Sequence, residues 1–562
     1  MAGLDPAIHV LPVTRKDVDA RDKPGYGGQT IVATTRDAPY QSTRERIGPA
    51  DGLAASFGRC MRFTSLVIEL IRARPRLIVW IAVLLQAAMW LFVALVFYRS
   101  PPGTLATLLA FGREYQVGTD LGPPLPVWLA DIAYRAAGGH MFGVYLLAEL
   151  CEIATFITLY YLSRAVVGSQ QAVLAVLLTM TVLAFSSSAL DFGPLILARP
   201  LWALLLLHSW QIIGQRRGNA WFAWSIEAGL LLLTTPAAIF LLLLIVIFAV
   251  STAGGRRTLR ALDPLFALIV VAVLALPYAV WLMRAETLVM PALPQVAELK
   301  ARTLHAAWLL GGLVLGAAAI PALTFLNTGL FAGKGEEPPI IYRPPVEPLA
   351  RNFVYFFALA PGLGAVLISC LLGLDSVVGS AGVVLVMSGL AVVVAAGDLI
   401  AMRRARMLRM VWAAAVVAPA VGVVLAVLLL PWTGANEIAT SMPARAISDF
   451  FDESFARRTN HRLRAVAGET QLASLITLHS GRPHLFIDAD PARTPWINQA
   501  KFSETGGVVV WRASDTAGTP PPDILKRFPG IVPEVPRAFE WLVTGRQQLL
   551  RVGWAIVRPK GT

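Results

Sequence analysis

Long apolar runs separated by short polar segments dominate the chain between residues 77 and 431. About 20 apolar residues are the length that a helix needs to cross the hydrocarbon core of a bilayer. We predict eleven such spans, at residues 77–98, 141–163, 170–189, 196–213, 220–234, 237–252, 264–283, 304–327, 352–373, 377–397 and 410–431. The spans 220–234 and 237–252 are short and flank Pro236, which predicts a tight hairpin or a broken pair.

The segments on either side of the apolar runs differ from them and from each other. Residues 1–60 are polar, rich in Arg, Asp, Gly and Pro, and show no sustained period, so we predict a disordered extension, with Met61 a plausible start of translation. After residue 431, short apolar runs such as "PHLFID" and "GGVVVWRA" alternate with helical patterns. This alternation predicts a small α/β domain at 432–562 after a transmembrane domain at 61–431.

Composition supports an α-helical polytopic membrane protein. The 562 residues are 56% hydrophobic and 15% charged, whereas soluble proteins have about 25% charged residues. The three cysteines suggest neither a disulfide framework nor a cysteine metal site. We find no phosphate-binding loop of the Walker type, which argues against an ATP-driven pump.

The net charge of +13 reports topology rather than nucleic-acid binding. Basic residues gather in short clusters between the apolar runs, as they do where Lys and Arg are retained on the cytoplasmic side. One orientation places the clusters at 216–217, 256–260 and 403–409 and the loop 328–350 in the cytoplasm. The same orientation predicts a bacterial inner-membrane protein whose loop 99–140 and C-terminal domain face the periplasm.

Two carboxylates, Glu114 and Asp120, lie in the first external loop within "GREYQVGTDLGPPLPVWLADIAYR". A carboxylate at the mouth of a helix bundle can bind a divalent cation or take a proton from a nucleophile. On spacing alone, ordinary solvated loop charges are the more frequent explanation. The segment from Pro123 predicts an interfacial helix on the outer leaflet, with an apolar face around Trp128 and with Asp131 on the polar face.

Further polar candidates lie within or beside the spans. Glu149 and Glu152 share one face of the second span, where carboxylates usually face a cavity or a partner. Asp191 lies near the external surface and Arg199 just inside the fourth span. Arg199 could hold a lipid-linked phosphate through its guanidinium, or could simply pair with Asp191.

Several stretches together resemble the membrane glycosyltransferases of the GT-C fold. They are "FGREYQVGTDLGPPLPVWLADIAYRAAGG", "YLLAELCEIATFITLYYLSRAVVG", "FGPLILARPLWALLLLHSW", "WFAWSIEAGLLLLTTPAAIFLLLL" and "DPLFALIVVAVLALPYAVWLMR". The chain is most similar to glycosyltransferase family 39, which includes protein O-mannosyltransferases and lipid A aminoarabinose transferases. The likeness covers residues 77 to about 284, and the later segments agree in layout only.

The resemblance implies transfer of a sugar, with inversion, from a polyprenyl-phosphate donor to an envelope glycan, lipid or protein on the periplasmic side. It implies a first-loop Asp acting as a base or as a ligand of a divalent cation, and Arg residues such as Arg113 and Arg199 beside the donor phosphate. Among the carboxylates, the metal would fall to Asp120 or Asp191.

The sequence departs from the family at the expected acidic pair, where Thr104 and Thr107 stand instead. A hydroxyl cannot replace a carboxylate base. Either Asp120 or Glu114 acts instead, or Asp191 supplies the charge, or catalysis has been lost. The alternative function is therefore a non-catalytic protein that binds or transports lipid-linked glycan.

Overall fold

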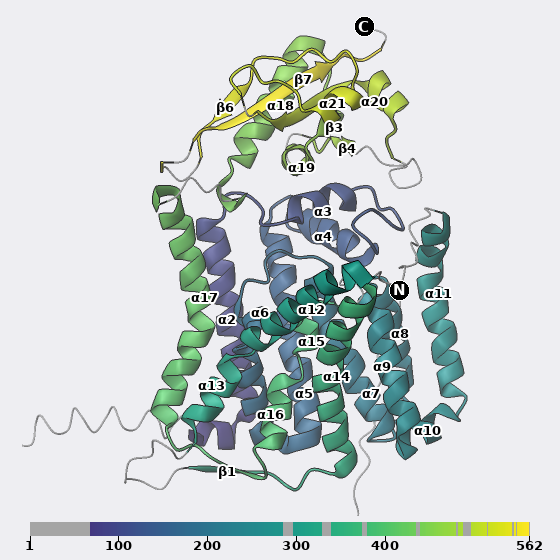
Figure 1. Cartoon of the computed structure of the whole chain (residues 1–562), viewed down its shortest axis with the longest axis vertical. Coiled ribbons are helices and arrows are strands. Elements are labelled where there is room, and N and C mark those ends of the chain that lie inside the picture. Colours follow the sequence, from purple (N-terminus) through teal and green to yellow (C-terminus); the bar gives the residue numbers. More distant parts are fainter. Residues whose placement is uncertain are drawn as a thin grey trace, which may run out of the picture. The chain divides into compact units, whose positions relative to one another are not determined.

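The computed structural model describes residues 68–284, 296–328, 339–373, 379–433, 439–478, 481–486, 496–513, 515–541, 545–546 and 548–560 (Figure 1). The predicted extension at 1–60 and the start at Met61 lie outside the described residues. The described part of the chain is mostly helical and belongs to one compact unit.

In the described ranges, six helices are long and apolar enough to cross a membrane, and up to eight crossings result if each of two bent pairs counts as one. The six are α2 (Pro75–Phe97), α5 (Phe142–Met180), α7 (Pro194–Ile213), α11 (Asp263–Arg284), α14 (Pro348–Leu372) and α17 (Ala405–Thr433). The bent pairs are α9 (Ala237–Ser251) with α10 (Ala253–Leu259), at 109°, and the Lys300–Gly316 part of α12 (Val296–Gly316) with α13 (Ala319–Leu326), at 42°. Shorter helices are α6 (Leu183–Ser186), α8 (Ala220–Leu232), α15 (Ala381–Val384) and α16 (Ser388–Ala395).

The predicted number of eleven spans is therefore not confirmed. The spans expected at 141–163 and 170–189 meet in the element α5, in which two helices are joined by a kink at Gly168, with φ 78°. The helix then ends at Met180, so its second part is shorter than a full span. The run at 377–397 likewise divides into α15 and α16. Apolar content alone does not show where a backbone bends or breaks, so the number of crossings stays a prediction.

A five-stranded sheet lies in the C-terminal part, in the order β4-β3-β5-β7-β6. Its strands are β3 (Ala465–Gly468), β4 (His484–Phe486), β5 (Gly507–Arg512), β6 (Arg537–Phe539) and β7 (Leu550–Val557). Strand β3 pairs in parallel with β4 and β5, whereas β7 is antiparallel to β5 and β6. Because β5 is covered on both faces, Val508, Val509 and Val510 are fully buried, as in parallel sheets.

Four helices accompany this sheet: α18 (Ala444–Thr459), α19 (Thr470–Leu478), α20 (Gln499–Thr505) and α21 (Pro522–Arg527). A separate two-stranded ribbon, β1 (Ile340–Tyr342) with β2 (Leu399–Ala401), lies at the opposite end of the long helices (Figure 1).

The first loop forms two short helices, α3 (Leu105–Gly112) and α4 (Leu125–Ala136), which lie beside the C-terminal part of the chain (Figure 1). Thr107 of α3 shares a hydrogen bond of 3.0 Å with Ser474 of α19. The Tyr134 hydroxyl of α4 donates to the carbonyl oxygen of Leu478 at 3.0 Å. The first loop and the C-terminal part are therefore packed against each other.

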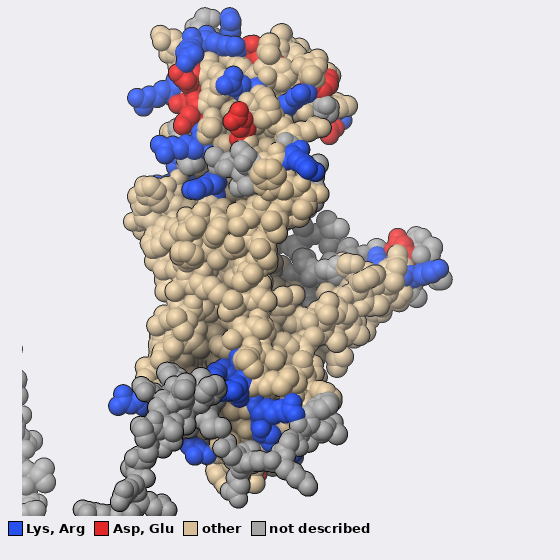
Figure 2. All heavy atoms as spheres, turned by 90° about the vertical axis from the view of Figure 1, so that its left-hand side faces the viewer, with Lys and Arg blue, Asp and Glu red and all other residues tan. Residues whose placement is uncertain are grey.

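Charge is distributed unevenly over the face shown in Figure 2. A broad band of uncharged residues separates a charged end, which carries the sheet, from a second end where Lys and Arg predominate. Side chains in the hydrocarbon region must be apolar, so this band marks the part of the surface suited to a bilayer.

Candidate functional site

The start of the first loop brings Asp191 against Gly103. Gly103 has φ +52°, a left-handed conformation that follows the pair Pro101–Pro102 and suits glycine. A Cβ atom on Gly103 would lie 2.0 Å from Oδ2 of Asp191. Only a residue without a side chain therefore lets the backbone approach this carboxylate so closely. The backbone N–H of Thr104 also donates a hydrogen bond to Asp191.

This contact places an acid beside Thr104, which is one of the two positions where the sequence lacks the expected acidic pair. Burial raises the pKa of Asp191 above its usual value, and the Thr104 hydrogen bond partly opposes that shift. A carboxylate with a raised pKa is a stronger proton acceptor when it is ionised, which suits a general base.

A cavity of about 330 Å³ opens beside these residues. Its polar lining comes from Tyr98, Arg99, Tyr134, His140 and Tyr145. Two of these side chains connect it to Asp191, since Tyr145 lies within electrostatic range of that carboxylate and Tyr98 bonds to the neighbouring Ser188. The chain leading to Gly103 is fixed here as well, because the N–H groups of Arg99 and Ser100 both donate to the carbonyl oxygen of Thr440. We call this region, with Asp191, the Asp191 site.

A second group of charged residues surrounds Asp131 in α4. Asp131 is fully buried and accepts from the Tyr115 hydroxyl at 2.9 Å and from Nε of Arg135 at 2.6 Å. Nη2 of Arg482, from the turn before β4, lies 2.7 Å from the other carboxylate oxygen. The prediction that α4 turns Asp131 outward as an interfacial helix is therefore wrong, because guanidinium groups compensate the buried charge and the face that carries it packs inward.

The candidates Arg113 and Glu114 belong to this second group. Oε1 of Glu114 lies 2.7 Å from Nδ1 of His484, at the start of β4, and the Glu114 side chain is only 8% exposed. Burial lowers the pKa of Arg113, whose charged neighbours include Glu114 and Arg482. Within the described chain, Nη1 of Arg113 is buried without a hydrogen-bond partner. Glu114 thus joins the first loop to the sheet, and its carboxylate is already paired.

The third group lies inside the helix bundle. The guanidinium of Arg199 in α7 pairs with Glu152 of α5, and not with Asp191 as one alternative had it. It also stacks over the Phe185 ring at 5.2 Å. Glu149 is buried on the same face of α5, one turn before Glu152. Because Arg199 and Glu152 are both buried, the geometry agrees with the expectation that the carboxylates of the second span face a partner inside the bundle.

The remaining candidates are Asp120, Thr104 and Thr107. Asp120 is exposed in the turn between Thr119 and Gly122. Thr107 is buried against Ser474, and Thr104 is exposed at the start of α3. Of the two threonines at the acidic-pair positions, only Thr104 adjoins a carboxylate.

A divalent cation finds a poor set of ligands in the Asp191 site. In the described ranges, no group of three or more His, Cys, Asp or Glu side chains could hold a metal ion. Asp191 provides one carboxylate, and no two other His, Cys, Asp or Glu side chains of the described residues complete a set with it. A cation normally takes several protein oxygens, so no reaction step is assigned to one here.

Sequence reasoning missed several residues that the fold brings to these groups. Arg99 directly follows the first span, a position that is typical of an interfacial cation. The sequence pattern alone could therefore have indicated Arg99 as a candidate. Arg482 and His484 gave no comparable signal, because they reach the first loop only through the fold of the C-terminal part.

Residues 122–281 match the sequence family described as dolichyl-phosphate-mannose-protein mannosyltransferase. The match covers more than a quarter of the chain and includes Asp131, Asp191 and Arg199, but begins after Gly103. It confirms, over these residues, the predicted resemblance to membrane glycosyltransferases of the GT-C fold. No protein of curated function matches the chain in sequence.

Two solved structures are weakly similar. Arabinofuranosyltransferase AftD from Mycobacteria aligns with a TM-score of 0.47 and 14% identity, over 86% of this chain and 42% of AftD. The archaeal oligosaccharyltransferase AglB from Archaeoglobus fulgidus, determined with an inhibitory peptide and a dolichol-phosphate, aligns with a TM-score of 0.35 and 12% identity, over 72% of this chain and 64% of AglB. This chain thus spans less than half the length of AftD, and both likenesses are too weak to decide its fold or function.

Proposed function

We propose that this protein is a membrane glycosyltransferase that moves a sugar from a polyprenyl-phosphate donor to an envelope acceptor, with inversion, and that Asp191 is its catalytic base. The observation that carries the proposal is the contact of Asp191 with Gly103 and Thr104, where the family resemblance requires an acid. The match of residues 122–281 to the mannosyltransferase family supports the reaction class.

In the proposed reaction, the carboxylate of Asp191 accepts the proton of the acceptor hydroxyl. The hydroxyl oxygen then attacks the anomeric carbon as the bond from that carbon to the phosphate oxygen breaks. The bonding electrons leave with the polyprenyl phosphate, and attack from the opposite side inverts the anomeric centre. A base positioned in this way contributes about 10²–10⁴-fold to the rate.

Arg99 is the proposed partner of the departing phosphate. It lines the same cavity as Tyr98 and His140, and guanidinium groups bind phosphate oxygens through paired hydrogen bonds. Arg113 and Arg199 fit this role less well, because Arg113 lies among the charges around Asp131 and Arg199 pairs with Glu152 inside the bundle.

The proposed orientation places the Asp191 site and the C-terminal part in the periplasm of a bacterial inner-membrane protein. The gathering of Lys and Arg at the opposite end of the uncharged band supports this orientation, because cytoplasmic loops are enriched in them (Figure 2). A periplasmic reporter fused after residue 440 should be active, and activity of a cytoplasmic reporter at that position would overturn the orientation.

A transfer assay tests the catalytic assignment in membranes supplied with polyprenyl-phosphate sugars. We expect Asp191→Asn to lower turnover at least about 100-fold, because an amide cannot take the proton. Glu114→Gln and Asp120→Asn are the matched controls and should retain turnover within a few-fold. Loss of turnover in Asp120→Asn with an active Asp191→Asn variant would overturn the assignment.

One observation favours the non-catalytic alternative: Thr107, at the second acidic-pair position, is buried against Ser474 and is unsuited to chemistry. If no donor is turned over while lipid-linked sugar binds measurably, the protein is a binding protein for such glycans.

A further inference from the structure

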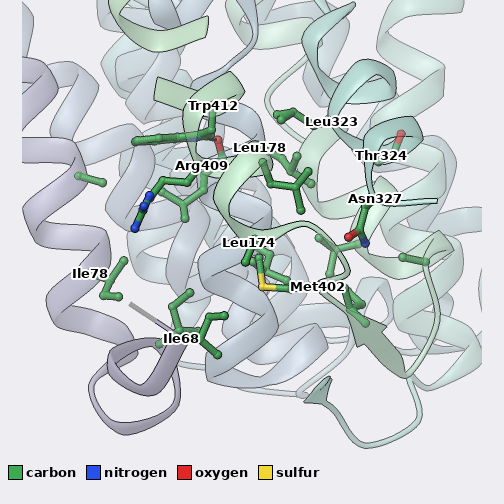
Figure 3. Close-up of a pocket in the computed structure, with 18 of the residues that line it drawn as sticks. Ile68, Ile78, Leu174, Leu178, Leu323, Thr324, Asn327, Met402, Arg409 and Trp412 are labelled. Carbon is green, nitrogen blue, oxygen red and sulfur yellow. Dashed lines mark hydrogen bonds between the residues drawn. The ribbon is translucent and has the colours of Figure 1, made fainter. Parts of the chain in front are cut away.

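A second cavity lies far from the Asp191 site, beside strand β2, at the end of the long helices opposite the C-terminal sheet (Figures 1 and 3). It has a volume of about 600 Å³ and is lined by α2, α5, α13, α16 and α17 and by the helical turn at residues 68–71. Sites for small organic ligands typically have about 300–1,000 Å³. The cavity is therefore large enough for part of a lipid.

The cavity walls are almost entirely aliphatic. Leu174 and Leu178 of α5 line it together with Leu323 of α13 and Ile78 of α2 (Figure 3). Such walls have no hydrogen bonds to offer a polar ligand, so they favour hydrocarbon chains.

Most of the polar groups at the cavity are already engaged by the protein. The Trp412 indole N–H donates to the carbonyl oxygen of Leu177 at 2.8 Å. The Asn327 side chain donates to the carbonyl oxygen of Ala401 and accepts from the backbone N–H of Arg403. These contacts fix the wall and leave one charged group in the lining, Arg409, one turn before Trp412 on α17 (Figure 3).

Arg409 lies in a strongly basic neighbourhood. Arg403, Arg404 and Arg406 precede it in sequence, and Arg72 lies beside the turn at 68–71. Among the described residues, no Asp or Glu forms an ion pair with Arg409. An apolar cavity whose only charged lining residue is a cation, in a basic environment, is complementary to a lipid with an anionic headgroup.

We propose that this cavity binds the acyl chains of an anionic phospholipid from the bilayer, with its headgroup phosphate against Arg409. The site is separate from the Asp191 site, so its occupancy does not depend on glycosyl transfer. A lipid held there would occupy the cavity that α2, α5 and α17 line beside their direct contacts.

Native mass spectrometry tests the proposal on the purified full-length protein, after reconstitution in nanodiscs of equimolar phosphatidylglycerol and phosphatidylcholine. We expect one phosphatidylglycerol to be retained, at least about fivefold more often than phosphatidylcholine. Arg409→Gln should abolish that preference. Arg406→Gln, which removes a neighbouring charge outside the cavity lining, should leave it unchanged.

A large side chain placed in the cavity gives an independent test, because it removes the space that the acyl chains would occupy. Leu178→Trp should reduce retention of either lipid at least about fivefold, and Ala82→Trp on α2 serves if the first variant does not fold. Retention that persists in a folded filled variant, equal retention of both lipids by the wild type, or equal effects of Arg409→Gln and Arg406→Gln would each overturn the proposal.

Discussion

Asp131 and Arg482 join the first loop to the C-terminal sheet through an ion pair of 2.7 Å, in which the carboxylate is fully buried. Arg482 adopts a positive φ of 53° and also donates to the carbonyl oxygen of Leu109 in α3. Its guanidinium lies 5.1 Å from the centre of the Tyr134 ring. One side chain from the C-terminal part thus contacts both short helices of the first loop.

Asp131→Asn is expected to destabilise the protein by up to about 3 kcal/mol, because it leaves Arg482 without its compensating charge. This is the lower end of the range for breaking a buried pair, since the second partner, Arg135, is half exposed. Thermal unfolding in detergent, followed by tryptophan fluorescence, measures the change. Asp449→Asn, which breaks an exposed pair with Arg445, is the control and should cost less than about 1 kcal/mol. Equal shifts in the two variants would contradict the assignment.

Gly103→Ala is expected to abolish most transfer while the protein still folds. The new methyl group would need the space of the Asp191 carboxylate, 2.0 Å away, and would displace it. A displacement of about 1 Å costs roughly 100-fold in rate. Gly530→Ala is the matched control, because Gly530 also has a positive φ but no atom lies within 4 Å of an added Cβ. Both variants bear the left-handed strain of about 1–2 kcal/mol, so only crowding at Asp191 should separate their activities.

Much of the membrane architecture could be predicted from the sequence, because apolar runs determine which segments favour the bilayer. The interruption near Gly168 was predicted as well, since one expected span ends at 163 and the next begins at 170. The end of the second helix at Met180 could not be predicted, because the apolar run continues beyond that residue. The site was predicted in part: Asp191 was a candidate, but its contact with Gly103 depends on how two distant loops pack. Asp131 was placed on the wrong face because its partners Tyr115 and Arg482 are not visible in the helical pattern of α4 alone.

Glu152→Gln is expected to destabilise the helix bundle by about 3 kcal/mol, the lower end of the range for breaking a buried pair, because Arg199 would lose its ion-pair partner and keep only the charge of Glu149 nearby. The double variant Glu152→Leu with Arg199→Met should recover most of this loss, since two apolar side chains need no compensation. Thermal unfolding of the three proteins gives the comparison. If the double variant is stable but no longer binds donor lipid, Arg199 contacts the phosphate as the sequence had suggested.

The pH dependence of transfer should report on Asp191 directly. The carboxylate must be ionised to act as a base, so the rate should rise with pH through its pKa. Because burial raises that pKa, the midpoint of the acidic limb of kcat/KM should lie above the ordinary value of about 3.9 for Asp. The limb should be absent from the residual activity of Asp191→Asn.

The raised pKa of Asp191 also affects the stability of the fold, which should fall with rising pH where the transfer rate increases. A raised pKa means that the folded protein binds this proton more tightly than the unfolded chain does. The stabilisation is fully present below the unfolded pKa and is lost as pH rises through the folded value. At neutral pH the charged Asp191 therefore destabilises the fold, and Asp191→Asn should unfold at a higher temperature than the wild type. Below the ordinary pKa of Asp the difference should disappear, and a gain in stability that is independent of pH would contradict the assignment of a strained catalytic carboxylate.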